Sequence, residues 1–132
     1  MTTTTTTAAS IQFAALPALG TEFEGGIFAG ITTQKDGTHA AVILLPDRAE
    51  ELTWKKAMAW AEKLNATLPT RPVAALLFAN VQPALSPEWH WTADEYNASY
   101  AGLCTFHYGY QNYLHKVSEL AAVAVRCIPL TA

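Results

Sequence analysis

Charged side chains are scarce in this chain, and basic ones are the scarcer kind. Its 132 residues include eight Lys and Arg against eleven Asp and Glu, which gives a net charge of −3. The basic residues are scattered and form no stripe that could follow a phosphate backbone, so we expect no nucleic-acid partner. Apolar residues make up 51% of the sequence, which argues against disorder and for a well-filled core.

Long apolar runs are also missing. No uninterrupted apolar segment is long enough to span a bilayer, so we expect no membrane insertion. The N-terminus, Met1 followed by six threonines, lacks the basic residues and the apolar run of a secretory signal. We therefore expect a protein made in the cytoplasm without a signal peptide, with association with a virion left open.

Only two cysteines are present, Cys104 and Cys127, so at most one disulfide can form. Both lie on predicted strands between apolar residues, which favours two small buried thiols. In a reducing cytoplasm we expect them to be free. A disulfide between them stays open for an exported or virion-borne protein.

Patterns of metal-binding and catalytic residues are absent as well. His39, His90, His107 and His115 show no metal-ligand spacing, and the chain has no Cys-x-x-Cys and no acidic calcium loop. The serines lack the glycines of a nucleophile elbow. We therefore expect no enzyme, no bound metal and no cofactor.

The chain divides into a tail and one domain. Residues 1–18, rich in Thr and then Ala, predict a flexible N-terminal tail, and residues 19–132 predict a single domain. Residues 23–31 and 39–45 are typical of two strands joined by an Asp-Gly turn, so they predict a hairpin. Pro46 is expected to stop the second strand.

Two helices are predicted between the hairpin and the C-terminal third. The first covers residues 52–64, with Thr53 as its cap, and the second follows Thr70 and ends at Gln82. Arg71 is expected to bind carbonyl groups or a carboxylate of the sheet. The residues with predicted structural roles are Trp54, Met58, Thr70, Arg71, Phe106 and Arg126.

The last third combines short aromatic strands with polar turns. Its ring and amide surface exceeds what a core of this size can absorb, so part of it should be exposed as a ligand-binding face. Period-two alternation predicts that Phe106 points inward and His107 outward. The rings could instead cover the sheet or form a subunit interface. The predicted ligand-binding residues are Trp91, Tyr96, Asn97, Tyr100, His107, Tyr108, Tyr110, Asn112 and Tyr113.

Several motifs in a fixed order resemble the Lcl C-terminal-like domain of unknown function that is found in bacterial and phage proteins. They are Gly25-Gly26-Ile27-Phe28-Ala29-Gly30, Leu52-Thr53-Trp54, Leu68-Pro69-Thr70-Arg71, Trp89-His90-Trp91-Thr92-Ala93, Gly109-Tyr110-Gln111 and Val125-Arg126-Cys127. The resemblance implies an α+β, C-type-lectin-like fold in which two helices pack on a small twisted antiparallel sheet. An acidic residue usual after the Arg71 motif is missing here, which leaves any salt bridge of Arg71 in question.

The resemblance also implies a function. It points to a non-catalytic recognition module, phage or prophage encoded, that binds a protein or glycan as an adhesin or tail-fibre domain does. It implies a homo-oligomer, with a trimer as one form. Calcium-dependent sugar binding is disfavoured because Gln82-Pro83-Ala84 lacks the second oxygen ligand of sugar-binding lectins. The alternative is an intracellular phage structural, assembly or host-inhibitor protein that uses the same face.

Overall fold

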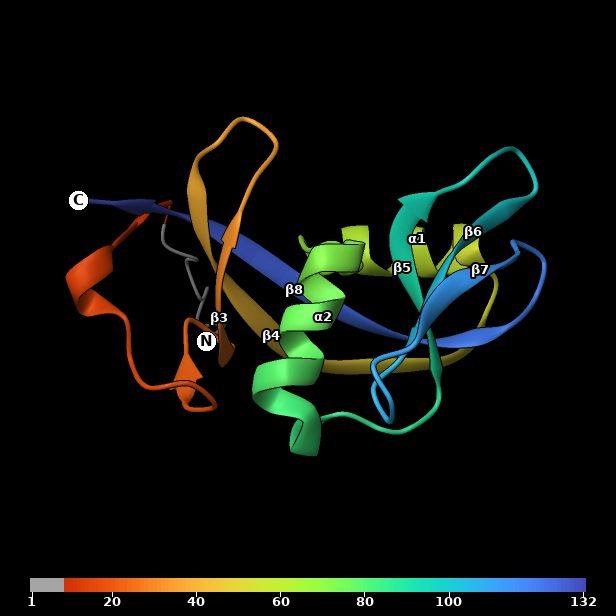
Figure 1. Cartoon of the computed structure of the whole chain (residues 1–132), viewed down its shortest axis with the longest axis horizontal. Coiled ribbons are helices and arrows are strands. Elements are labelled where there is room, and N and C mark those ends of the chain that lie inside the picture. Colours follow the sequence, from red (N-terminus) through yellow and green to blue (C-terminus); the bar gives the residue numbers. More distant parts are fainter. Residues whose placement is uncertain (1–8) are drawn as a thin grey trace, which may run out of the picture.

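The computed structural model describes residues 9–132 as an α+β fold built on one mixed, eight-stranded sheet with two helices (Figure 1). The strand order is β2-β3-β4-β8-β5-β6-β7, and β1 also pairs with β8. The elements are β1 (Ile11–Gln12), η1 (Phe13–Ala15), β2 (Glu22–Phe23), β3 (Gly26–Thr33), β4 (His39–Leu52), α1 (Trp54–Lys63), α2 (Arg71–Val81), η2 (Gln82–Ala84), β5 (Trp89–Glu95), β6 (Tyr100–Thr105), β7 (Gln111–His115) and β8 (Leu120–Thr131).

The predicted hairpin is confirmed. Strands β3 and β4 pair antiparallel, with Ile31 opposite Ala41. In the turn between them, the Asp36 carboxylate accepts hydrogen bonds from the Thr38 backbone N–H at 2.9 Å and from the Thr38 hydroxyl at 2.6 Å. This side-chain-to-backbone bond is the local device that Asp supplies in turns.

The prediction that Pro46 stops β4 is wrong. The strand continues to Leu52, and its pairing with β8 shifts register between Leu44 and Arg48. Pro46 falls inside this irregular stretch. A residue without a backbone N–H is tolerated at a bulge because no ladder bond is required from it there.

The prediction of a small, wholly antiparallel sheet is also wrong. Strand β8 runs antiparallel to β4 along most of its length, but it pairs parallel with β5 at Ala121 and with β1 at Leu130. Between these two points, Thr67 forms an isolated bridge to Val125, with N···O distances of 3.0 and 2.8 Å. The long strand β8 therefore organises elements from both ends of the chain.

Part of the predicted tail belongs to the fold. Residues 1–8 lie outside the described residues, but Ile11 is buried and joins the core beneath β8. Its backbone position pairs with Leu130, and Leu16 packs against the same core. The packed part of the chain thus includes Ile11, ahead of the predicted boundary at residue 19.

Both helices begin where the sequence predicts. The Thr53 hydroxyl accepts from the Lys56 N–H at the start of α1, and the Thr70 hydroxyl accepts from the Val73 N–H at the start of α2. A side-chain oxygen at this position satisfies an N–H that has no partner within the helix. Helix α2 ends before η2, as predicted from Gln82-Pro83.

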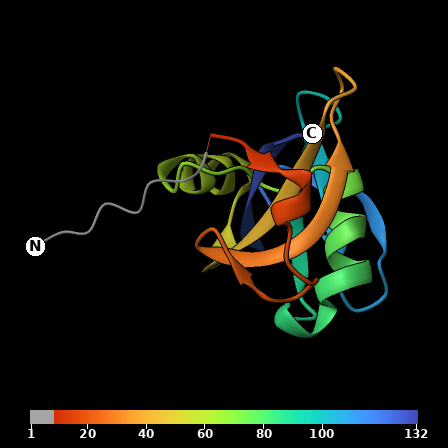
Figure 2. The same cartoon turned by 90° about the vertical axis from the view of Figure 1, so that its left-hand side faces the viewer.

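The two helices cover opposite faces of the sheet (Figures 1 and 2). Helix α1 packs on the face to which β4 contributes Ile43, and α2 packs on the face to which β4 contributes Val42 and Leu44. A strand that is covered on both sides must be apolar at consecutive positions. This explains the uninterrupted buried run from Ala40 to Leu45.

Candidate functional site

The β5–β6 hairpin and β7 lie at the end of the molecule opposite the C-terminus, and they carry the rings of the predicted binding face (Figure 1). Strand β6 pairs antiparallel with β5 and with β7. The predicted residues do not form one surface. They fall into two groups, one around the β5–β6 turn and one where β5 begins and β6 ends.

Trp91 is not on the surface, so its assignment to the ligand-binding face is wrong. Its side chain has no exposed area, and its indole N–H donates to the Leu52 carbonyl at 2.8 Å. Trp89, two residues earlier, is 47% exposed. Alternation places both rings on one side of β5. Which of the two is covered depends on what packs over that side, and the sequence pattern does not contain that information.

The first group, which we call the tyrosine cluster, comprises Tyr96, Tyr100, Tyr113 and His115. Tyr96 is 63% exposed and stacks on Tyr113, with centroids 4.5 Å apart. Tyr100 is half-buried and lies against His115, with centroids 4.3 Å apart and 3.2 Å between the hydroxyl and Nε2. The cluster therefore has one largely exposed ring, that of Tyr96, which stacks on the ring of Tyr113.

Arg71 ties the tyrosine cluster to the start of α2. Its Nε donates to the side-chain oxygen of Gln111 at 2.9 Å, and its Nη1 donates to the Tyr113 hydroxyl at 2.6 Å. Gln111 in turn donates to the Arg71 carbonyl at 2.8 Å, and the guanidinium lies 5.0 Å from the Tyr113 ring centroid. The guanidinium thus binds the side-chain carbonyl oxygen of Gln111 on β7, as expected, and its second partner is the Tyr113 hydroxyl.

The carboxylate near this site has another role. Asp94 accepts the Arg71 backbone N–H at 2.7 Å, where the positive end of the helix dipole favours an anion. Within residues 9–132, the one side-chain ion pair joins Lys116 to Glu95. The charge of Arg71 is therefore held by neutral groups and by the face of a tyrosine ring.

Both predicted asparagines are engaged within the protein. The Asn97 side-chain oxygen accepts from the backbone N–H groups of Ser99 at 2.8 Å and Tyr100 at 2.9 Å, so it shapes the β5–β6 turn. Asn112 donates to the Tyr110 hydroxyl and accepts from the Tyr113 N–H at 2.8 Å. Their amides position the neighbouring rings.

The second group forms what we call the aromatic hollow, a surface depression of about 420 Å³. Trp89 and Tyr110 make its main walls, with ring centroids 5.7 Å apart and planes at 86°. His107 is exposed, and Tyr108, 78% exposed, lies edge-on to it at 4.2 Å. The residues that line the hollow are Pro87, Trp89, Thr105, His107, Tyr108 and Tyr110.

The turn that carries these rings is fixed from several sides. The Thr105 carbonyl accepts a hydrogen bond from the Gly109 N–H at 3.1 Å, and the Thr105 N–H donates to the Tyr110 carbonyl at 2.9 Å. The Gln82 side chain donates to the Phe106 carbonyl at 3.0 Å. Phe106 is buried, as expected, whereas Tyr108 does not share its face because β6 already ends at Thr105. The rings therefore project from a rigid support.

Thr105 is unusual among the lining residues. It is only 6% exposed, and its hydroxyl has no hydrogen-bond partner, the one such buried side-chain atom in residues 9–132. A buried polar atom without a partner carries a cost of about 1–3 kcal/mol. Unsatisfied groups of this kind mark positions where a further interaction would be favourable.

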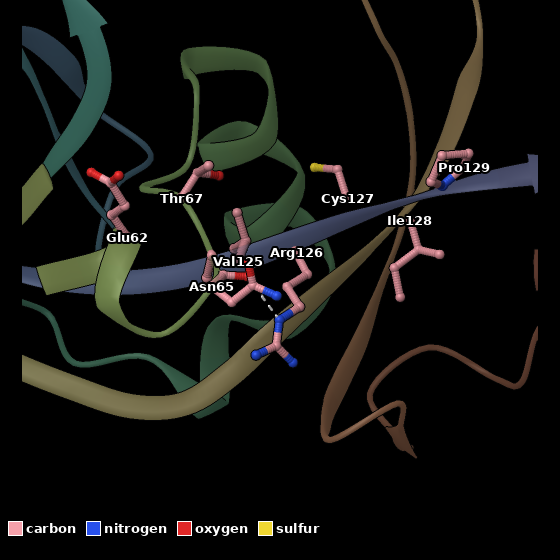
Figure 3. Close-up of a pocket in the computed structure, with 9 residues that line it drawn as sticks. Glu62, Asn65, Thr67, Val125, Arg126, Cys127, Ile128 and Pro129 are labelled. Atoms are coloured by element: carbon pink, nitrogen blue, oxygen red, sulfur yellow. Dashed lines mark hydrogen bonds between the residues drawn. The ribbon is translucent and has the colours of Figure 1, made fainter. Parts of the chain in front are cut away.

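A different hollow, of about 380 Å³, lies beside Arg126 in β8 (Figure 3). The Arg126 guanidinium donates to the carbonyls of Leu64 at 2.8 Å and Asn65 at 3.1 Å. Asn65 has a left-handed backbone, with φ of 55°, where α1 ends. Arg126 thereby satisfies carbonyl groups that lack partners within the helix, and its Nε and one Nη group are directed at the protein itself.

The ionisable groups of the core are held in their neutral forms. Burial raises the pKa of the Cys104 thiol to about 12 and raises the pKa of the Cys127 thiol. Both cysteines are free. Burial also lowers the pKa of His90, whose Nδ1 lies 2.7 Å from the Glu88 carbonyl. A thiol with a raised pKa is a poor nucleophile at neutral pH.

No three His, Cys, Asp or Glu side chains in the described part of the chain lie close enough together to hold a metal ion. Nor does any helix between residues 9 and 132 have the length and apolar character needed to cross a membrane. A comparison with known protein families finds no match, and a comparison with curated protein sequences finds no relative.

Proposed function

We propose that this protein is a non-catalytic recognition module that binds a protein or glycan through its aromatic hollow. The observation that carries the proposal is the pairing of two half-exposed rings, that of Trp89 at the start of β5 and that of Tyr110 in a turn held by hydrogen bonds. Rigid aromatic side chains supply large contact areas at low entropic cost. Exposing them on a fixed support costs solvation energy that a partner would recover.

We further propose the C-type-lectin-like fold and the attachment role that the resemblance to Lcl-type and phage domains implies. The order of a hairpin, two helices and then strands supports this proposal, as does the pairing of β1 with β8, which brings the two end segments together. In this proposal the protein is phage or prophage encoded and presents the aromatic hollow to a cell-surface ligand.

We also propose that the protein forms a homo-oligomer through the other end of the molecule. Phe13 is 61% exposed there, and Ile31 and Leu130 line an apolar depression with it. These residues lie on η1, on β3 and near the C-terminal end of β8, away from the β5–β7 end (Figure 1). Assembly there would leave the aromatic hollow free, and light scattering of wild-type protein and an Ile31→Asp variant tests it.

The experiment for recognition is a glycan and protein array that is screened with wild-type, Trp89→Ala and Tyr96→Ala proteins. We expect Trp89→Ala to lose more than tenfold in affinity without a change in unfolding midpoint, as an exposed anchor does. Loss in Tyr96→Ala alone would move the site to the tyrosine cluster. If binding is unchanged in both variants, the aromatic surface is not the recognition face. Binding only to an intracellular phage or host protein would favour the alternative role.

A further inference from the structure

The walls of the aromatic hollow meet almost at a right angle. The Trp89 and Tyr110 planes are inclined at 86°, with centroids 5.7 Å apart, and both rings are nearly half exposed. A compact group in the angle between perpendicular rings touches two faces at once, whereas a flat ring stacks fully on only one. The shape therefore favours a small, rounded ligand group over a flat one.

The electrostatics of the hollow favour a cation. The faces of aromatic rings carry the negative part of their quadrupole, which attracts a positive group placed over them. None of the lining residues is Lys, Arg, Asp or Glu, so the lining has neither a fixed positive charge to repel a cation nor a carboxylate to pair with it.

We infer that the aromatic hollow binds a trimethylammonium group of the choline type. This inference rests on the proposed function and names the chemistry of its ligand. A primary ammonium is strongly hydrated, and each of its three N–H groups needs an acceptor when its water is removed. A trimethylammonium group has no N–H, is compact and is weakly hydrated, so ring faces can replace its water without leaving a donor unpaired.

The surroundings of the hollow favour a small head group over a methylated lysine within a peptide. A bound peptide gains much of its affinity from backbone hydrogen bonds to a free edge. Beside the hollow, the Thr105 N–H is already bound to the Tyr110 carbonyl, and the Gly109 N–H to the Thr105 carbonyl. These two amides are therefore not available to a peptide backbone.

The test is a titration of ¹⁵N-labelled protein with choline chloride, followed by NMR of the 105–110 backbone amides and the Trp89 indole. The control ligand is 3,3-dimethylbutan-1-ol, which has the shape of choline without its charge. We expect millimolar affinity for choline and at least about tenfold weaker binding of the neutral analogue, because the cation–π attraction requires the charge.

Variants separate ring faces from hydroxyl groups. Tyr110→Phe keeps the ring face and should bind choline within about twofold of wild type, whereas Trp89→Ala should bind at least about tenfold more weakly. A sugar held by the tyrosine hydroxyl would show the opposite result for Tyr110→Phe. Val117→Ala shortens an exposed apolar side chain outside the hollow, and it should leave the titration unchanged.

Several results would overturn the inference. These are equal binding of choline and its neutral analogue, loss of choline binding in Tyr110→Phe, or a trimethyllysine peptide that binds more than tenfold more tightly than choline. If choline does not bind but the array yields a ligand whose binding is lost in Trp89→Ala, the choline assignment is refuted and the proposed function stands. Choline binding with the expected charge dependence, but no array ligand, would support the site and remove the protein-or-glycan proposal.

Discussion

Gly109 is the residue on which the shape of the aromatic hollow depends most directly. It sits between Tyr108 and Tyr110 with φ of 74°, a left-handed conformation that a side chain disfavours. A Cβ built there would lie 2.9 Å from two carbons of the Phe78 ring on α2. The substitution Gly109→Ala therefore introduces two separable costs, backbone strain and a steric clash.

The two costs can be estimated from a matched position. Gly37, in the β3–β4 turn, has φ of 87° and nothing within 4 Å of a built Cβ. Gly37→Ala should therefore show backbone strain alone, about 1–2 kcal/mol. Gly109→Ala should add the cost of overpacking against Phe78, about 1–3 kcal/mol, for a total of about 2–5 kcal/mol. The Gly109 variant should also displace the rings on either side of it.

Urea unfolding of Gly37→Ala, Gly109→Ala, Phe78→Ala and the Gly109→Ala/Phe78→Ala double variant measures these terms. In the double variant the clash is absent, so the added cost of Gly109→Ala should fall to the value found at Gly37. If the losses in free energy of unfolding caused by Gly109→Ala and Gly37→Ala differ by less than about 0.5 kcal/mol in the wild-type background, the Phe78 ring moves aside at no measurable cost. The turn would then not be the rigid support on which the proposed site relies.

The remaining predictions concern side-chain burial, ionisation and the contacts that join distant elements. Trp91→Ala should lower the free energy of unfolding by about 3–5 kcal/mol by urea denaturation, and a smaller loss than in Trp89→Ala would reverse our assignment of core and surface. Cys104 should resist iodoacetamide at pH 8.5 in the folded protein. Burial raises the pKa of the Cys104 thiol to about 12, so the neutral thiol contributes stability that is fully present below the ordinary thiol pKa. This contribution should be lost as pH rises from about 9 toward 12. A free energy of unfolding that stays constant over this range, relative to Cys104→Ala, would contradict the prediction. Arg71→Lys should cost about 1–2 kcal/mol because lysine cannot reproduce the paired bonds of the guanidinium, and an unchanged unfolding midpoint would show that the bonds contribute nothing. Ile11→Ala should cost about 2 kcal/mol if β1 is part of the core, and a change below about 0.5 kcal/mol would return this segment to the predicted tail.

The candidate site could be predicted from the sequence only in part. The density of rings between residues 89 and 113 indicates an exposed aromatic surface. Tyr96 and Tyr108 are largely exposed, and Trp89 and Tyr110 are nearly half exposed. The sequence pattern predicts Trp91, and not Trp89, among the ligand-binding residues, whereas Trp91 is buried and Trp89 is exposed. Alternation gives the side of a strand to which a residue points, but exposure depends on which distant residues cover that side.

Local features of the fold were determined by the sequence alone. The Thr53 and Thr70 caps and the Asp36 turn each depend on a hydrogen bond between residues at most three positions apart. The residue types at neighbouring positions are therefore enough to predict them. The partition of β4 between two buried faces is likewise visible as a continuous apolar run. Such interactions form between residues whose separation is fixed by the backbone.

Only the tertiary structure decided how distant segments meet. The parallel pairing of β8 with β1 and β5, the inclusion of Ile11 in the core and the bonds of Arg71 to Gln111 and Tyr113 join residues that are 30 to 120 positions apart. Many partners compete for each such contact, and the winner is set by how the whole core packs. The right-angled corner of the aromatic hollow arises in the same way. Trp89 begins β5 and Tyr110 lies in the turn after β6, so their rings meet only when β5, β6 and this turn are assembled.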